Sequence, residues 1–398
     1  MKTKLKLFLS ALSLALAVML VTSCAPTPPE AGTDTPTETD TQTESVSEST
    51  DAATTEEEET PMIKFTVFAD FHYKKKMYMS SVDDLKTILK RAKDSGSDFV
   101  VHLGDFCNDY IGSPEITNAY LENEYDLPVF GVYGNHELET SGNTMQIVSR
   151  RLSNRPVSFG PSREGNTTGH WYYDMKGFRL IGLDTNYSFN PTKQAWEHNK
   201  AGSHAPPSGN EQTYSLGPEQ REWLDKILAD AESKGMKALI FSHAGFSEKW
   251  YAGSDADDVR AIFKKYEKTV MMASSGHLHT NRFAVVDNIA YFDVNTAKNG
   301  YWSQQQNHHY TSLHTYEFQN YSQGEPKGDV QTLALTSLSQ GKNTWFFKDP
   351  LSAVVTVYTD GEIHIDGSKT EWLYGIEPPV SRTEVTPMIG NSKIKLRK

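Results

Sequence analysis

Five short clusters of metal-type ligands lie along this chain, and most of them come directly after a run of apolar residues. In chain order the clusters are Asp70 with His72, Asp105, Asn135 with His136, His243, and His277 with His279. The apolar runs at residues 65–69 and 99–103 lead into Asp70 and Asp105. Such runs, bounded by turn residues, predict buried strands, so we expect the ligands to project from strand ends. A rigid sheet edge is where a metal site is best held.

The residue types in these clusters suit a centre of two divalent ions. Such a centre needs a carboxylate that bridges both ions, further nitrogen or oxygen ligands for each, and a hydroxide between ions about 3.5–4 Å apart. Asp105 is the natural bridge, and the glycines before Asp105 and Asn135 let the backbone turn so that the following side chains face the ions. The mixture of imidazole, carboxylate and amide oxygen suits Zn, Mn, Fe or Co, and no cysteine takes part.

Together these residues resemble the signature of the calcineurin-like metallophosphoesterase family: D-x-H, G-D, G-N-H-[DE], an isolated H and G-H-x-H. The matching segments are Asp70-Phe71-His72, Gly104-Asp105, Gly134-Asn135-His136-Glu137, His243 and Gly276-His277-Leu278-His279. The resemblance runs from about Ile63 to Asp293. Each short motif alone is frequent by chance, whereas their joint occurrence in this order, with two specific tetrapeptides, is not.

The resemblance implies a role for each of these residues. It gives Asp70, His72, Asp105 and His279 to the first ion, and Asp105, Asn135, His243 and His277 to the second. His136 would not be a ligand; it would face the scissile ester and protonate the leaving group, a kind of help typically worth about 10²–10⁴ in rate. A hydroxide on the ions would attack phosphorus, while both cations neutralise charge on the phosphoryl oxygens.

From residue 62 onward, strand-like runs alternate with amphipathic helical segments. We expect helices that begin near Ser81, Pro218 and Asp255, and strands at residues 237–241, 269–274, 282–286, 289–292, 354–358 and 362–365. Together with the resemblance, this pattern predicts an α/β fold, a four-layer α/β/β/α sandwich of two mixed sheets flanked by helices. We place the metallophosphoesterase domain at residues 62–366 and a C-terminal tail at residues 367–398.

The first residues indicate an extracytoplasmic protein that is anchored to a bacterial cell membrane. Three lysines precede an apolar run from Leu7 to Val21, which is short for a transmembrane span. The segment Val21-Thr22-Ser23-Cys24 resembles the lipobox of a lipoprotein signal peptide. We therefore expect residues 1–24 to be a signal peptide with lipid on Cys24, each buried methylene contributing ~0.8 kcal/mol to membrane binding. An ordinary secretory signal with an incidental cysteine is the alternative.

Residues 25–61 consist of Thr, Glu, Ser and Pro with scarcely an apolar residue. A segment of this composition cannot bury enough surface to offset its conformational entropy, so we expect a disordered tether. Of the formal net charge of −12, the eleven acidic residues of the tether contribute −11 and the three leading lysines +3, which leaves −4 for residues 62–398. This charge gives no indication of a nucleic-acid partner.

The resulting expectation is a lipid-anchored, two-metal phosphoesterase whose substrate is a small phosphate ester. A phosphodiesterase, including one for cyclic nucleotides, is an open alternative within the same chemistry. A non-catalytic, metal-holding lipoprotein that binds phosphorylated ligands is the alternative from another class. The intact His136 argues against that class, since binding alone would not need a positioned acid.

Overall fold

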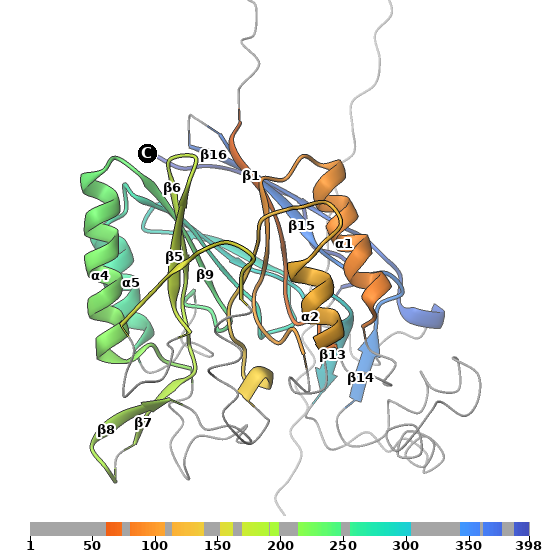
Figure 1. Ribbon diagram of the computed structural model, residues 1–398, viewed down its shortest axis with the longest axis horizontal. Helices are drawn as coiled ribbons and strands as arrows, with labels where there is room; N and C mark the ends of the chain where they lie inside the picture. The colour runs from red at the N-terminus through yellow and green to blue at the C-terminus, as the bar shows by residue number, and fades with distance from the viewer. Residues whose placement is uncertain are drawn as a thin grey trace, which may run out of the picture. The chain divides into compact units, whose positions relative to one another are not determined.

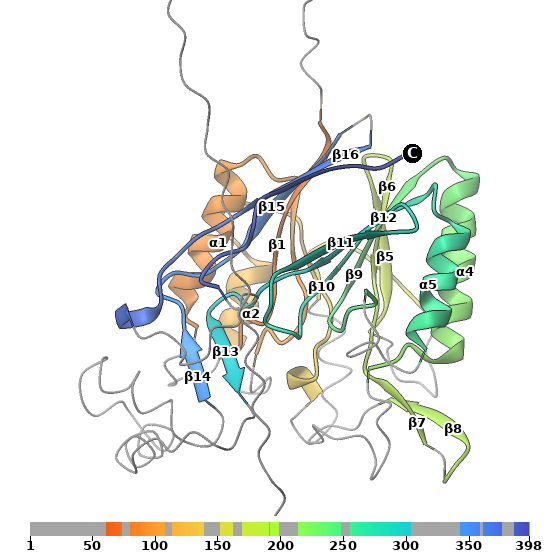
Figure 2. The ribbon, with the colours of Figure 1, turned by 180° about the vertical axis from the view of Figure 1, so that it is seen from behind.

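The computed structural model of the protein contains two packed β-sheets with helices on both outer faces (Figures 1 and 2). It describes residues 61–73, 80–107, 114–138, 152–161, 169–190, 192–198, 214–247, 255–303, 343–358, 361–375 and 386–397. The expected signal peptide with Cys24 and the expected tether lie outside these ranges, apart from Pro61. Within the described ranges, every helix is too short or too polar to cross a bilayer.

One sheet has six strands in the order β17-β16-β15-β1-β2-β3. Its strands are β1 (Pro61–Phe68), β2 (Phe99–His102), β3 (Val129–Gly131), β15 (Ala353–Tyr358), β16 (Glu362–Gly367) and β17 (Ser392–Lys395). Strands β1, β2 and β3 run parallel, and β15, β16 and β17 continue the sheet in antiparallel pairs. Every residue of β2 is buried, as expected for a parallel strand covered on both faces.

The second sheet has seven strands in the order β11-β12-β10-β9-β6-β5-β4. These are β4 (Ser158–Phe159), β5 (Trp171–Met175), β6 (Phe178–Gly182), β9 (Lys237–Ser242), β10 (Val270–Ser275), β11 (Arg282–Val286) and β12 (Ile289–Asp293). The central strands β12, β10, β9 and β6 run parallel, with antiparallel strands at both edges. Both sheets are therefore mixed, as the sequence predicts.

Two pairs of helices complete the four layers (Figure 1). Helices α1 (Val82–Asp94) and α2 (Pro114–Leu121) pack on the six-stranded sheet, and α4 (Gly217–Ser233) and α5 (Ala256–Lys265) pack on the seven-stranded sheet. The predicted start of α1 is confirmed, because Ser81 and Asp84 form a reciprocal capping box there. The α/β/β/α prediction is confirmed.

Aromatic side chains fill the space between the two sheets. Phe65 and Phe99, from neighbouring strands, stack with ring centroids 4.9 Å apart, and Phe241 of the other sheet meets both rings edge-on at 5.7 and 6.1 Å. Full burial of a side chain of this size contributes about 1.5–3 kcal/mol. This packing fixes the two sheets against each other within six residues of Asp70, Asp105 and His243, the predicted ligands that follow these strands.

Smaller elements border the sandwich. They are the hairpin β7 (Tyr187–Asn190) and β8 (Ala195–His198), the pair β13 (Asn299–Ser303) and β14 (Asn343–Phe346), and the 3₁₀ turns η2 (His136–Leu138) and η3 (Leu373–Gly375). Neither these pairs nor α2 is predicted from the sequence.

The C-terminal residues correct one expectation. We expected residues 367–398 to form a tail outside the domain, yet β17 pairs with β16 and is the edge strand of the six-stranded sheet. Ile389 and Leu396 are buried, and Ile394 packs against the core between the sheets. The alternation of apolar residues with lysines in this segment gives it one face for the core and one for solvent.

Candidate metal centre

The predicted ligands lie on loops at the carboxyl ends of five strands. Asp70 follows β1, Asp105 follows β2, Asn135 follows β3, His243 follows β9 and His277 follows β10, while His72, His136 and His279 come one or two residues later on three of these loops. Three loops therefore belong to the six-stranded sheet and two to the seven-stranded sheet. The candidate site is built from both.

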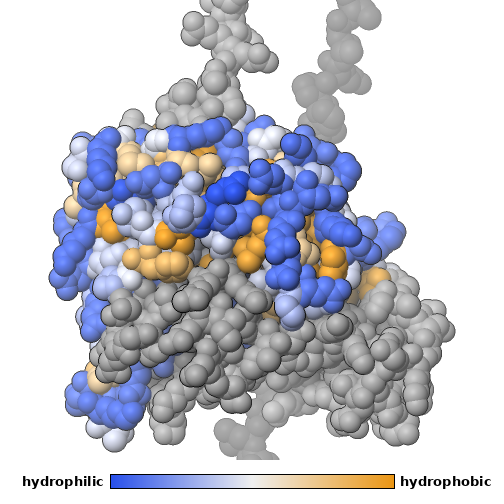
Figure 3. Space-filling view, in the orientation of Figure 1, coloured by the Kyte–Doolittle hydropathy of each residue, from blue (hydrophilic) through white to orange (hydrophobic). Residues whose placement is uncertain are grey.

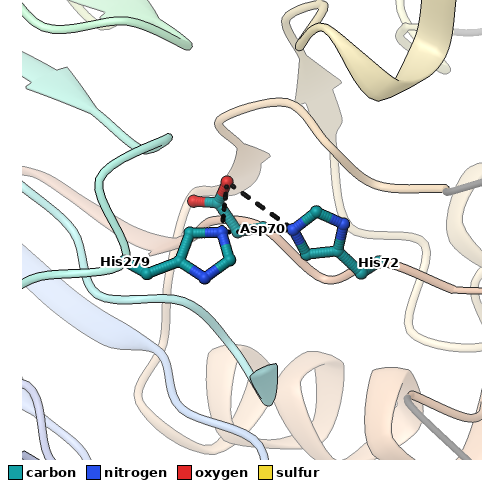
Figure 4. Close-up of side chains that lie close together, drawn as sticks. All are labelled: Asp70, His72 and His279. Carbon is teal, nitrogen blue, oxygen red and sulfur yellow. Dashed lines mark hydrogen bonds and ion pairs between the residues drawn. The ribbon is translucent and has the colours of Figure 1, made fainter. Parts of the chain in front are cut away.

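Asp70, His72 and His279 form the first group of ligand atoms (Figure 4). The Nε2 atoms of His72 and His279 are 3.2 Å apart, and Asp70 Oδ1 lies 3.3 Å from His279 Nε2 and 4.0 Å from His72 Nε2. The side chains of Asp70 and His72 are fully buried, and that of His279 is 11% exposed. They come from loops of different sheets, so the group joins the two layers.

His243 is the centre of a second group. Its Nε2 atom lies 3.2 Å from Asp105 Oδ2, 3.1 Å from Asn135 Oδ1 and 3.1 Å from His277 Nδ1. Its other ring nitrogen, Nδ1, donates a hydrogen bond to the carbonyl of Leu103 at 2.8 Å. That bond fixes the ring so that Nε2 faces the other ligand atoms.

Asp105 links the two groups. Its Oδ2 atom is 3.2 Å from His243 Nε2 in the second group and 4.0 Å from His72 Nε2 in the first. The same oxygen is 3.9 Å from His136 Nε2, so His136 also has a ring nitrogen within the ligand clusters. This position is compatible with a ligand as well as with an acid beside the ions.

The donor set fits a pair of divalent cations. Imidazole nitrogens and carboxylate oxygens lie within 4.8 Å of one another in each of three clusters, and the amide oxygen of Asn135 lies 3.1 Å from His243 Nε2. Asp70 Oδ1 is buried, and within the described part of the chain it accepts no hydrogen bond of good geometry. A buried carboxylate oxygen in that condition is stabilised by a bound cation.

The pKa values of three imidazoles differ in direction. Burial lowers the pKa of His72 and of His277 to about 3, so both rings are neutral and have lone pairs to offer a metal. Burial also acts to lower the pKa of His243, but the adjacent Asp105 carboxylate outweighs it and raises that pKa to about 10. Without metal, His243 therefore carries a proton that an ion at the second group must displace.

Strained backbone is concentrated on the same loops. Asp70, His72, Asp105, His277 and His279 have φ values of 50°, 51°, 48°, 67° and 52°. The left-handed region costs a residue with a side chain roughly 1–2 kcal/mol. Strain of this kind is typical of functional sites, where the surrounding structure over-determines the geometry.

The two glycines named in the sequence analysis have different roles. Gly104 has φ of +87° and makes the turn before Asp105, as expected. Gly134 is not in that region of φ; instead it leaves space, because a Cβ there would lie 2.1 Å from Asp105 Oδ1. The correction is that close approach of two loops, and not a sharp turn, requires the second glycine.

The structure adds two residues to which the sequence analysis gave no role. The buried carboxylate of Glu137 accepts hydrogen bonds from the backbone of the Asp105 and Gly134 loops. Burial and the charge of Asp105 raise the pKa of Glu137 to about 7, and its backbone donors oppose that shift. The ring of Tyr214 lies 4.4 Å from that of His277. Only the motif position of Glu137 gave a signal in the sequence; Tyr214 gave none.

With this geometry in view, residues 63–281 match the family of calcineurin-like phosphoesterases. The chain belongs to that family. The matched region contains every predicted ligand, from Asp70 to His279. The chain is a metal-dependent phosphoesterase, and its histidine and aspartate clusters are consistent with a dinuclear site.

Individual relatives are more distant. The chain is 23% identical over 270 residues to the manganese-dependent ADP-ribose/CDP-alcohol diphosphatase of Arabidopsis thaliana, covering 56% of this chain and 82% of that protein. It is 24% identical over 246 residues to sphingomyelin phosphodiesterase 2 of Caenorhabditis elegans, covering 54% of this chain but only 36% of that protein. A crystal structure of a dimetal phosphatase from Danio rerio superposes with a TM-score of 0.45 and 14% identity, covering 77% of this chain and 96% of that one.

Proposed function

We propose that this phosphoesterase works with two divalent ions and that seven side chains hold them. The first ion is assigned to Asp70, His72, Asp105 and His279, and the second to Asp105, Asn135, His243 and His277. The observation that carries the assignment is the position of Asp105, which has ligand atoms of both groups within 4.0 Å of one oxygen. When bound, the ions would activate a water and neutralise charge on the phosphoryl group.

We further propose that His136 protonates the leaving group. It follows the proposed ligand Asn135 directly, and its backbone N–H donates to Asp105 Oδ1 at 2.8 Å, which fixes its main chain beside the bridge. Its Nε2 atom lies 3.9 Å from Asp105 Oδ2, and its side chain is 11% exposed, as is that of the assigned ligand His279. A proton on the His136 ring would then be close to the ester oxygen of the leaving group.

Manganese is the ion to test first. The ligand types are compatible with Mn, Fe, Zn or Co. The name of the Arabidopsis relative states a manganese dependence, which supports Mn²⁺ for this chain. Four metals loaded separately into chelator-treated protein would rank them by turnover.

For the substrate we propose a small phosphate ester. A phosphodiester is the second candidate, because the C. elegans relative is named as a phosphodiesterase. The deciding experiment is a turnover screen of Mn²⁺-loaded protein against phosphomonoesters, linear and cyclic phosphodiesters, and nucleoside diphosphate compounds. Hydrolysis of none of them, with tight binding of any, would favour the non-catalytic binding protein instead.

The ligand assignment is tested with Asp105→Asn. This change keeps the size of the side chain and removes the charge that holds two cations close together. We expect loss of at least one ion per molecule and of turnover, measured by metal analysis and kinetics on the same samples. Two retained ions with near-normal turnover would refute the assignment.

We also propose that the protein is held at a bacterial membrane through lipid on Cys24, outside the cytoplasm. The lipobox-like segment and the polar residues that follow it support this proposal. Replacing Cys24 with Ser should release the protein from the membrane fraction with turnover unchanged. Continued fractionation with membranes would refute the lipid anchor.

A further inference from the structure

Glu137 is a buried acidic residue between two ligand loops, and the ligand assignment leaves it without a role. Glu137 is only 4% exposed. Its Oε2 accepts the backbone N–H of Asp105 at 2.9 Å and of Gly134 at 2.6 Å, and its Oε1 accepts that of Phe106 at 2.6 Å and of Cys107 at 3.1 Å. Each carboxylate oxygen thus takes two backbone donors.

Asp105 makes the reciprocal contact. Its Oδ1 accepts the backbone N–H of His136 at 2.8 Å, while Glu137 accepts that of Asp105. Residues 104–107 and 134–137 therefore each use a carboxylate to bind the backbone of the other segment. The two segments thus exchange side-chain-to-backbone hydrogen bonds reciprocally, as in a capping box, but between two loops instead of within one helix.

The two loops are also in direct contact. A Cβ on Gly134 would lie 2.1 Å from Asp105 Oδ1 and 2.4 Å from Asp105 N, so the backbones leave no room for a side chain. Bonds to a charged acceptor are stronger than neutral ones, and this acceptor is shielded from water. Few positions of one loop relative to the other satisfy all four hydrogen bonds that join them.

We propose that Glu137 is the positioning residue of the metal centre, and that it sets the distance between Asp105 and Asn135 that two ions require. The proposal rests on the assignment of these two residues as ligands. Changing a residue that orients ligands typically lowers metal affinity or activity about 10–100-fold. Glu137 acts here through backbone, since all four of its donors are main-chain N–H groups.

The first test compares Glu137→Gln with a matched control. Asp98 is also a carboxylate that accepts a backbone N–H group, that of Lys64 at 3.0 Å, and its side chain is 18% exposed, but it precedes the start of β2 whereas Asp105 follows the end of that strand. We expect Glu137→Gln to lower Mn²⁺ affinity about 10–100-fold in titration calorimetry, because the amide NH₂ faces donors it cannot accept from. Asp98→Asn should lower the unfolding temperature and leave Mn²⁺ affinity unchanged.

A spectroscopic readout separates position from stability. Two Mn²⁺ ions that share a bridging ligand give an exchange-coupled electron paramagnetic resonance spectrum, and separated ions do not. At saturating Mn²⁺ we expect the coupled spectrum from the unchanged protein, its loss or marked weakening in Glu137→Gln, and an intermediate spectrum in Glu137→Asp, which keeps the charge on a shorter side chain. A spectrum and affinity in Glu137→Gln equal to those of the unchanged protein would overturn the proposal, as would an equal loss of affinity in Asp98→Asn.

One measurement needs no variant. In metal-free protein, the amides of Phe106, Cys107 and Gly134 should exchange slowly with deuterium, because their hydrogens are bonded to Glu137. Rapid exchange at these three amides would overturn the proposal even if Glu137→Gln does not fold. If the unchanged protein binds fewer than two Mn²⁺ ions while these amides are protected, the ligand assignment fails and the role of Glu137 as a brace between the loops stands.

Discussion

The two sheets contribute unequal halves to the metal centre. The six-stranded sheet supplies both carboxylates, the amide and one imidazole ligand, together with the proposed acid His136. Its loops bind one another: Asp70 N–H donates to Gly104 O at 3.2 Å and His72 N–H to Asp105 O at 2.8 Å. The seven-stranded sheet supplies three imidazoles, and two of its contacts run across to the first sheet, from His243 Nδ1 to Leu103 O and from His277 N–H to Asp70 Oδ2.

This difference indicates how the centre is assembled. The loops of the six-stranded sheet form a frame that is fixed by its own hydrogen bonds. The histidines of the other sheet are positioned by docking onto that frame, and Asp70 is the residue that serves both purposes. A change in the frame should therefore disturb both ions, whereas a change on the histidine side should disturb one.

The largest effect is expected for Asp70→Asn. Asp70 is a proposed ligand of the first ion, and its Oδ2 also accepts the N–H of His277, which is assigned to the second ion. We expect both ions to bind weakly and turnover to fall by more than the 10–100-fold typical of residues that only orient ligands. His279→Ala is the matched change on the histidine side and should weaken only one ion. Equal losses in the two variants, by metal titration, would contradict the comparison.

His136→Ala is expected to have the next largest effect. If His136 donates the proton, turnover of esters with alkyl leaving groups should fall about 10²–10⁴-fold. Turnover of nitrophenyl esters should fall much less, because nitrophenolate leaves without being protonated. Both ions should remain bound. A similar and small loss on both ester types would exclude the general-acid role, and loss of an ion would make His136 a ligand.

The pH dependence of metal-free protein should show opposite contributions from the imidazoles. Since the pKa of His243 is raised to about 10, its contribution to stability is fully present below pH 6.5 and is lost as pH rises toward 10. Since the pKa values of His72 and His277 are lowered to about 3, their contributions are fully present above pH 6.5 and are lost as pH falls toward 3. Each effect is on the order of 1 kcal/mol per unit of pKa difference.

Urea unfolding in the presence of a chelator at pH 5, 6.5 and 9 would measure this dependence. The protein should lose stability between pH 6.5 and pH 9, and His243→Gln should lose less over that range. Mn²⁺ affinity should rise with pH over the same alkaline range, because binding releases the His243 proton. A stability that rises steadily from pH 6.5 to 9 would contradict the assignment of a charged His243.

The frame and the histidine side also differ in how much of them the sequence predicts. Ligands such as Asp70 and Asp105 were found because apolar strands precede them at short and regular distances. The hydrogen bonds of Glu137 are not predictable in this way. Three of its donors lie 30 to 32 residues away, and they are backbone N–H groups, which every residue type except proline carries. Strand β17 was missed because a short strand at a sheet edge, half lysine, has the composition of a basic tail.

The smallest effect is expected for Tyr214, which tests whether the histidine side has any support of its own. Its ring lies 4.4 Å from that of His277 at an interplanar angle of 52°, and its φ of 69° is in the left-handed region. The backbone there is fixed from both sides: Ser215 pairs with Tyr187, and Asp255 accepts the N–H groups of Leu216 and Gly217.

An aromatic pair of this kind contributes about 0.5–1.5 kcal/mol, so Tyr214→Leu should weaken the second ion roughly 2- to 10-fold, and Tyr214→Phe should restore it. Mn²⁺ titration of both variants measures this, with turnover at saturating metal as the control for substrate contacts. If Leu and Phe behave alike and like the unchanged protein, the ring of Tyr214 does not position His277, which is then held by the bond of its N–H to Asp70 and by the bond from Gly276 N–H to His243 O. If Phe fails as Leu does, the hydroxyl and not the ring is the group that supports the second ion.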